Sequence, residues 1–480
     1  MVVGKGVQEG EVLNTPSSHL LGAGRRFLCL AVLAGMAVSL RAATHRVPAE
    51  RLAATLTSIA AGDTIVILPG VYEGDLTIRQ RVTLLGEGEA VVRGEGKGSS
   101  ITLFADSCVI DGLVVEHCGV MLTDEDAGIL VKSHGNILRN NRLRDILFGI
   151  YLFQSEGNLV TGNTIVGRRE LDLGERGSGI HIWNSNRNVF RGNVITDTRD
   201  GFYVQNANRT QVEDNVVYGV RYGLHYMYAD SNVFLRNVFA DNVAGAAVMY
   251  SHDITIRHNV FQRNRGFASF GILFQDCSGL VVDSNVIADN VVGLFFEATR
   301  KNTFRHNIIA QNDVALEMFQ NSTENVFLEN NFVDNLSPLA LIGKSTGSHW
   351  GAGGLGNYWS GYDGYDMNGD GIGDIPMKIE NVFQYLEARN ANVRLYLYSP
   401  ASQALAMAAR AFPVIPVSTE ADAAPLMLPV QLGDLPAIKL AAKTGTTPMR
   451  EVNGAQWMML SGIAGVGLLY TYRAVARRKG

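Results

Sequence analysis

The sequence predicts an all-β protein, a right-handed parallel β-helix (a solenoid) built from coils of about 22 residues. One observation is a phrase led by asparagine, such as Asn-Val-Val at Asn215 and Asn-Val-Phe at Asn237. A second is a phrase led by glycine that keeps the same step, from Gly201-Phe-Tyr-Val to Gly223-Leu-His-Tyr. The asparagine phrase also occurs at Asn163, Asn193, Asn259, Asn285, Asn307 and Asn330. A fixed period of this size is typical of solenoids, in which each unit buries its apolar face against the next.

Within one period, short β-rich runs alternate with turn-forming residues. In Ser231–Gly245, the runs Val233–Leu235 and Val238–Ala240 are each followed by residues that favour turns. Such runs are too short for helices, and Asn, Asp and Gly tolerate left-handed backbone. We therefore expect three short strands per coil and a buried asparagine ladder at one corner. The residues expected to stack inside are Ile150, Ile180, Phe202, Leu224, Ile272 and Leu294.

Irregular segments interrupt and precede the array. Two long intervals between asparagines predict corner insertions at Arg168–Arg176 and Arg265–Ser269. Ala49–Ala61 has a helical pattern, and a helix there would cover the open edge of the first coil. We therefore expect a helical N-terminal cap with the first coils at 44–100, and the regular β-helix at 101–352.

Two apolar segments indicate export and membrane attachment. Arg25 and Arg26 precede the apolar run Phe27–Leu40, which is short for a membrane span, so residues 1–43 are predicted to be a signal peptide. The stretch 454–472 carries no charge and is followed by a basic tail, 473–480. This pattern predicts a transmembrane helix whose C-terminus is cytoplasmic, although a buried helix is the alternative. We expect a periplasmic protein anchored to the inner membrane.

Charge and cysteine content narrow the classes of partner and site. The formal net charge of −5 argues against nucleic acid as the main partner. Of the four cysteines, Cys29 lies in the predicted signal peptide, and Cys108, Cys118 and Cys277 have no zinc-site spacing. We expect three buried thiols, with one disulfide as the alternative.

An Asp- and Gly-rich loop at 353–380 is expected to cap the C-terminal end of the array. Before and after Gly371 it holds oxygen ligands at alternating positions, as a calcium-binding loop does. At the position where such a loop has a bidentate glutamate, this chain has Met377. A calcium site and a metal-free turn are therefore both consistent with the sequence. The candidate calcium ligands are Asp366, Asn368, Asp370 and Asp374.

The remaining segments are a docking region and a linker. Residues 381–416 are apolar with helical character and are expected to contact a membrane protein. A Pro- and Ala-rich linker, 417–453, follows. The candidate docking residues are Tyr385, Leu386, Leu405, Met407 and Phe412.

These features together resemble the NosD family. The most specific motif is Gly356-Asn-Tyr-Trp-Ser-Gly-Tyr-Asp-Gly-Tyr-Asp-Met-Asn-Gly-Asp-Gly-Ile-Gly-Asp-Ile-Pro376, and Ser399–Phe412 is similar to that family's docking region. The resemblance implies a periplasmic accessory protein for assembly of the copper centre of nitrous oxide reductase. Its implied partners are the permease and ATPase subunits of an ABC transporter, the reductase and a copper chaperone. The C-terminal membrane helix departs from the expected family form.

Strand alternation suggests where copper would bind. Side chains that alternate with the buried ones face outward, in columns through Tyr203 and through Gln205. Thioethers and imidazoles suit Cu(I), and an aromatic and methionine surface for a protein partner is the alternative. The predicted Cu(I) ligands are His181, His225, Met227, Met249 and His252.

The alternative function is that of a lyase, hydrolase or epimerase acting on uronic-acid polymers. Such enzymes need clustered carboxylates or a base beside a cationic residue. Asp200, Asp276 and Glu297 fall in different coil registers and are interpreted as solvated corner residues. The sequence therefore predicts an accessory protein without catalytic residues.

Overall fold

The protein is described from a computed structural model, which describes residues 42–266, 269–343, 345–379, 399–401, 404, 407–408 and 420–431. The chain divides into two units, Met1–Ala42 and Ala43–Gly480, and every described residue except Ala42 belongs to the second. The predicted transmembrane helix and basic tail lie outside the described residues, as do nearly all of the predicted signal peptide. Residues 420–431 of the predicted linker are described, and they pack on the C-terminal end of the solenoid instead of forming an unpacked linker. Within the described ranges, no helix is long and apolar enough to cross a membrane.

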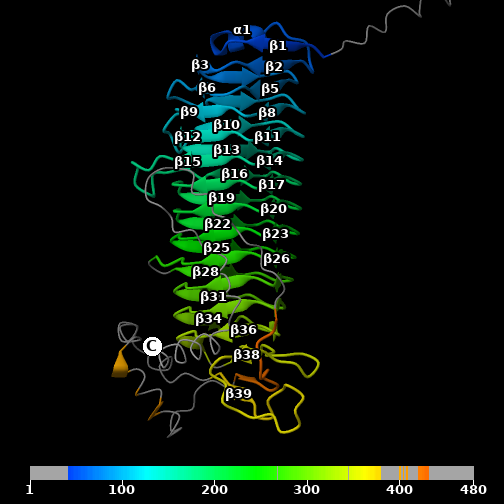
Figure 1. The fold of residues 1–480 in the computed structure, drawn as a ribbon, viewed down its shortest axis with the longest axis vertical. Coiled ribbons are helices and arrows are strands. Elements are labelled where there is room, and N and C mark those ends of the chain that lie inside the picture. The colour runs from blue at the N-terminus through cyan, green and yellow to red at the C-terminus, as the bar shows by residue number, and fades with distance from the viewer. Residues whose placement is uncertain are drawn as a thin grey trace, which may run out of the picture. The chain divides into compact units, whose positions relative to one another are not determined.

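The second unit is a parallel β-solenoid in which a coil contributes one strand to each of three long sheets (Figure 1). Sheet A contains β1 (Thr44–Val47), β2 (Thr64–Ile67), β5 (Thr83–Gly86), β8 (Val109–Asp111), β11 (Ile137–Arg139), β14 (Leu159–Thr161), β17 (Val189–Arg191), β20 (Gln211–Glu213), β23 (Val233–Leu235), β26 (Thr255–Arg257), β29 (Val281–Asp283), β32 (Thr303–Arg305) and β35 (Val326–Leu328). Sheet B contains β3 (Gly70–Glu73), β6 (Ala90–Arg93), β9 (Val114–Glu116), β12 (Arg142–Ile146), β15 (Thr164–Gly167), β18 (Val194–Thr196), β21 (Val216–Tyr218), β24 (Val238–Ala240), β27 (Val260–Gln262), β30 (Val286–Ala288), β33 (Ile308–Ala310), β36 (Asn331–Val333) and β38 (Tyr358–Trp359).

Sheet C carries the longest strands and forms the face on which the predicted copper ligands lie. It contains β4 (Leu76–Ile78), β7 (Ile101–Leu103), β10 (Ala127–Val131), β13 (Phe148–Phe153), β16 (Ile180–Trp183), β19 (Asp200–Gln205), β22 (Tyr222–Met227), β25 (Ala244–Met249), β28 (Phe270–Gln275), β31 (Val292–Glu297), β34 (Val314–Phe319) and β37 (Ser337–Ile342). All pairings within the three sheets are parallel, so equivalent residues of successive coils are neighbours.

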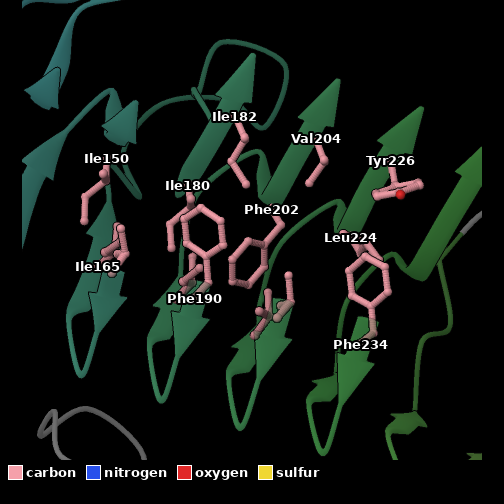
Figure 2. Packing of buried hydrophobic residues seen from close by; sticks show 14 of the residues in the cluster. Ile150, Ile165, Ile180, Ile182, Phe190, Phe202, Val204, Leu224, Tyr226 and Phe234 are labelled. Carbon is pink, nitrogen blue, oxygen red and sulfur yellow. The ribbon is translucent and has the colours of Figure 1, made fainter. Parts of the chain in front are cut away.

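The predicted inward column is confirmed. Ile150 is the register partner of Ile180, Ile180 of Phe202, and Phe202 of Leu224. These side chains are buried and point into the core, where Phe190 and Phe234 pack against them (Figure 2). The strand register predicted from alternation is therefore correct.

The asparagine ladder is also confirmed. The backbone N–H and the side-chain amide of Asn215 both donate to Oδ1 of Asn237, at 3.0 and 2.9 Å. Asn237 donates in the same way to Asn259 and also to the carbonyl oxygen of Val212. A second ladder, missed by the sequence argument, lies at the next corner and contains Asn242, Asn264, Asn290, Asn312 and Asn335. In each ladder, the side-chain oxygens accept hydrogen bonds from buried backbone N–H groups that the turn would otherwise leave without a partner.

We predict that Asn237→Ala lowers the stability of the central coils. The change leaves both donors of Asn215 without their acceptor, and each buried unpaired donor costs about 1–3 kcal/mol. The midpoint of urea unfolding should fall clearly, whereas Lys301→Ala, at an exposed and distant ion pair, should leave it nearly unchanged. An unchanged midpoint in Asn237→Ala would show that the ladder adds little stability.

The corner insertions occur where they were predicted. Both lie between a strand of sheet B and the next strand of sheet C, after β15 and after β27. The first is held in place by Arg176, whose guanidinium donates to the carbonyl oxygens of Leu171 and Arg169 at 2.9 and 2.8 Å. The ladders continue across both insertions, so the extra residues do not disturb the stack.

The N-terminal end differs from its prediction. The helix spans only α1 (Leu52–Leu56), after a 3₁₀ turn at Ala49–Arg51, instead of the expected Ala49–Ala61. It ends early because the side-chain amide of Gln80 donates to the carbonyl oxygens of Leu56 and Ile59, which supply the end of the helix with partners. The strand β1, which was not predicted, pairs with β2 and belongs to the stack.

At the C-terminal end, two buried carboxylates hold two tryptophans. Asp422 accepts hydrogen bonds from Nε1 of Trp359 at 3.0 Å and from the backbone N–H of Asn357 at 2.7 Å. Glu420 accepts from Nε1 of Trp350 at 2.7 Å. Burial raises the pKa of Asp422, although these hydrogen bonds oppose the rise. The segment 420–431 therefore covers the last coil, and its two buried carboxylates accept hydrogen bonds from that coil.

That closure brings distant parts of the chain together. The short strands β39 (Met377–Lys378) and β40 (Ala421–Asp422) are antiparallel partners. The backbone N–H of Ile379 donates to the carbonyl oxygen of Glu420 at 3.1 Å. The residues that flank the predicted docking segment, 377–379 and 420–422, thus meet at the C-terminal end of the solenoid.

Candidate metal site on the outer face of sheet C

Two columns of outward side chains run along sheet C, one residue per coil. In the first column, His181 is the register partner of Tyr203, and Tyr203 of His225. In the second, Gln205 is the partner of Met227, and Met227 of Met249. Parallel strands lie about 4.8 Å apart, so Met227 and Met249 are adjacent.

The two methionines lie at the ends of β22 and β25, beside an exposed aromatic pair. Met227 and Met249 are both half-buried. The next residue of each coil is a tyrosine, and the rings of Tyr228 and Tyr250 stack at 5.0 Å with 51% and 38% of their surface exposed. The two methionines are therefore partly exposed beside an exposed aromatic pair.

His225 is held by a buried ion pair. Asp200 is fully buried, and Arg221 binds it with two hydrogen bonds, of 2.8 and 2.7 Å. Nδ1 of His225 lies 3.2 Å from Oδ2 of Asp200. Burial opposes ionisation of Asp200, but the hydrogen bonds from His225 and Arg221 outweigh it and lower its pKa. Asp200 is therefore an ionised acceptor, and its contact with His225 favours a proton on Nδ1.

His181 occupies an aromatic enclosure. Its ring stacks on Tyr203 at 4.5 Å and meets Tyr151 edge-on at 4.5 Å, and only 8% of the residue is exposed. Burial, with Arg199 nearby, lowers the pKa of His181 to about 3, so the ring is neutral at physiological pH. Its Nδ1 atom has no hydrogen-bond partner among the residues that the structure describes.

The structure brings only part of the predicted copper set together. Met227 and Met249 are neighbours, and His225 lies two residues before Met227 on the same strand face. His181 is separated from His225 by Tyr203. His252 lies at the corner after β25, where its Nδ1 contacts Oγ of Ser278 at 2.8 Å. In the described ranges, no group of three or more His, Cys, Asp or Glu side chains is arranged to hold a metal ion.

The interpretation of Asp200 as a solvated corner residue is wrong. Its side chain is buried because Arg221 and His225 of the next coil both contact it. No local pattern marks this contact, although Asp200 and Arg221 stand 21 residues apart, close to one period. Asp276 is exposed as expected, and Glu297 accepts a hydrogen bond from Gln275 at 3.0 Å.

The three described cysteines are buried thiols. Cys108, Cys118 and Cys277 are free and buried. Burial raises the pKa of Cys118 to about 11 and that of Cys277 to about 12. Both therefore remain thiols, whereas metal binding uses the thiolate.

The candidate calcium loop turns its oxygens toward its own backbone. The carboxylate of Asp366 accepts from the N–H groups of Gly369 and Gly371 at 2.6 and 2.8 Å, which lowers its pKa. Asp370 and Asp374 likewise accept from backbone N–H groups, and Asn368 donates to Asp370. The calcium site stays a prediction.

Most of the candidate docking residues cannot be placed. Tyr385, Leu386, Leu405 and Phe412 lie outside the described residues. Met407 is described, and 67% of it is exposed. Its role in docking also stays a prediction.

Comparisons with known proteins agree with the fold and add a family. Residues 161–364 match the family model described as "Periplasmic copper-binding protein (NosD)". A protein of Pseudomonas aeruginosa, "Probable ABC transporter binding protein NosD", is 37% identical over 374 residues, 75% of this chain and 86% of that protein. A protein of the same name from Stutzerimonas stutzeri is 35% identical over 372 residues, 75% of this chain and 85% of that protein.

Solved structures similar to this chain include β-solenoid enzymes. One is an alginate lyase from Paenibacillus, with a TM-score of 0.42 and 17% identity over 64% of this chain and 99% of that one. Another is the A-module of the mannuronan C-5 epimerase AlgE6 of Azotobacter vinelandii, with a TM-score of 0.47 and 16% identity over 60% of this chain and 89% of that one.

Fold and outer face together define a parallel β-solenoid protein whose sheet C carries two outward columns of side chains. Within that class, the identity to the two bacterial relatives extends over three quarters of the chain. The chain belongs to the NosD family.

Proposed function

We propose that this chain is a periplasmic accessory protein that works with an ABC transporter in delivering copper to nitrous oxide reductase. Membership of a family described as periplasmic copper-binding supports the copper role, and the names of its relatives support the transporter. The structural observation that carries the proposal is the register pair Met227 and Met249, with His225 beside it. Copper is the cargo of this surface.

The donors on this face suit Cu(I). Two thioethers and an imidazole are soft or intermediate ligands, which Cu(I) prefers to the oxygen donors that bind magnesium or calcium. The carboxylate that contacts His225, Asp200, is also bound by Arg221. A site of neutral donors would hold a singly charged ion without trapping it, as delivery to an acceptor requires.

Contact with the transporter is proposed for residues 381–416. The residues that flank that segment meet at the last coil, so a membrane permease bound to it would lie near the C-terminal end of the solenoid. The copper face of β22 and β25 lies several coils away along the stack (Figure 1). That separation leaves the face free for the reductase or a copper chaperone while the transporter is bound.

Attachment to the membrane yields a separate prediction. If 454–472 spans the inner membrane, deleting 454–480 should move the protein from the membrane fraction to the soluble periplasmic fraction. Immunoblotting of salt-washed membranes would measure the shift, with the intact chain as control. Full retention of the truncated protein would show that the docking segment is sufficient for attachment.

The proposed function is tested in a denitrifying strain that lacks this chain. Nitrous oxide reductase purified from that strain should contain little copper, and the intact chain should restore it. The restored chain should co-purify with the permease and ATPase subunits. Normal copper content without the chain would contradict the proposal, and so would cleavage of a uronic-acid polymer by the purified chain if Asp200→Ala abolished that cleavage.

A further inference from the structure

Asp200, Arg221 and His225 form a built unit next to the methionine pair. Both oxygens of Asp200 are bound by Arg221, Oδ2 also receives Nδ1 of His225, and Nε of Arg199 lies 3.6 Å from the same oxygen. The carboxylate is fully buried, whereas the side chain of His225 is 15% exposed. The buried carboxylate of Asp200 thus contacts the imidazole of His225, which is partly exposed to solvent.

This arrangement selects one tautomer of His225. Nδ1 of His225 lies 3.2 Å from Oδ2 of Asp200, which can only accept, and 3.5 Å from Nη2 of Arg221, which can only donate, and the shorter contact favours a proton on Nδ1. The neutral ring then has an unprotonated Nε2, whose lone pair points away from Asp200. Among the described residues, Nε2 has no hydrogen-bond partner. In metal proteins, a carboxylate behind a histidine commonly fixes the tautomer and the ring orientation of the ligand in this way.

We propose that His225 binds Cu(I) through Nε2, together with Met227 and Met249, and that Asp200 is the positioning residue that holds His225 in the required tautomer. The inference rests on the proposed function, because it needs copper on this face. Arg221 and Arg199 more than offset the charge of Asp200, so the carboxylate orients the ring without adding net negative charge beside the ion. The donors themselves, an imidazole and two thioethers, are neutral and suit Cu(I).

The same geometry separates His181 from the proposed copper site. Its ring is enclosed by Tyr151 and Tyr203, and Tyr203 stands between it and His225. No carboxylate orients its Nδ1 in the described structure. His181 is therefore placed outside the copper site, and its substitution should not change Cu(I) affinity.

The test uses the purified full chain with Cu(I) alone, titrated against a chromophoric Cu(I) chelator. Asp200→Asn keeps the shape of the side chain but offers an N–H to Nδ1 of His225, which favours the opposite tautomer. Loss of such an orienting partner typically lowers metal affinity by about 10–100-fold. Asp197→Asn makes the same chemical change three residues earlier, where Asn tolerates the left-handed backbone, and should leave the affinity unchanged.

The second readout is the tautomer itself. Long-range ¹H–¹⁵N spectra of histidine-labelled, copper-free protein should show His225 protonated at Nδ1 in the wild type and at Nε2 in Asp200→Asn. The His225 signals are those missing from His225→Gln. Loss of stability alone would not invert the tautomer, so this measurement separates a positioning role from a merely structural one.

The outcomes distinguish the inference from the function on which it rests. A wild-type chain that binds no Cu(I), or whose affinity is indifferent to Met227→Ala and Met249→Ala, overturns the proposed site and the inference with it. Wild-type affinity in His225→Gln or in Asp200→Asn overturns the inference alone, as does an Nε2–H tautomer in the wild type. His225→Gln keeps the test decisive even if Asp200→Asn fails to fold.

Discussion

Asp422→Ala should open the C-terminal end of the solenoid. The substitution removes the acceptor of Nε1 of Trp359 and of the backbone N–H of Asn357, both of which are buried. At about 1–3 kcal/mol for each buried donor left unpaired, the end should lose several kcal/mol. Trp359 stacks on Phe332 at 4.1 Å, so loosening this ring also exposes the core of the last coils.

The effect should be local before it is global. In a solenoid each coil contacts only its neighbours, so a lost end contact lets the terminal coils open while the middle stays folded. Hydrogen exchange at β36 and β38 should therefore accelerate strongly, and exchange at β19 and β22 should change little. Asp363→Ala, at an exposed residue of the same region, is the matched control. Equal exchange in Asp422→Ala and the wild type would show that this carboxylate does not hold the end.

Replacing both Met227 and Met249 with alanine should nearly abolish copper maturation in cells. The two thioethers are adjacent by register, and after their removal the face retains no pair of soft donors next to His225. Nitrous oxide reductase isolated from a strain carrying the double variant should approach the copper content found without the chain. Metal analysis of the purified reductase measures this directly.

The control for that experiment is chosen from the same columns. Gln205→Ala changes the register neighbour of Met227 but removes no soft donor, so copper content should stay near normal. Immunoblotting has to show equal amounts of each variant in the periplasm. A reductase with full copper content in the double methionine variant would contradict the proposed site, and the stripe would remain as a surface for a protein partner.

Periodic features of the fold could be predicted from the sequence. The alternation around Phe202 and Leu224 placed their side chains inside, and the 22-residue recurrence of Asn215 and Asn237 predicted a ladder. These features repeat in every coil, so any error in register would have appeared as a buried polar residue. Met227 and Met249 were placed side by side on the same grounds.

The features that were missed depend on contacts that do not recur. The burial of Asp200 needs Arg221 and His225 in the next coil, and its register partner there is Tyr222 rather than a second acid. Likewise, Trp350 meets Glu420 across 70 residues of chain, and no local pattern connects them. The early end of α1 involves Gln80 of a neighbouring coil, whose side-chain amide donates to the carbonyl oxygens of Leu56 and Ile59. Single tertiary contacts of this kind override local propensity.

The most direct test of the copper proposal is a Cu(I) titration of the purified chain under anaerobic conditions, in competition with a chromophoric chelator. The wild type should bind one Cu(I) per chain on this face, and Met227→Ala or Met249→Ala should each weaken that binding by about tenfold or more, the scale at which site residues typically act. Unchanged affinity and stoichiometry in both variants would contradict the proposed copper site, because Met227 and Met249 are its two sulfur ligands.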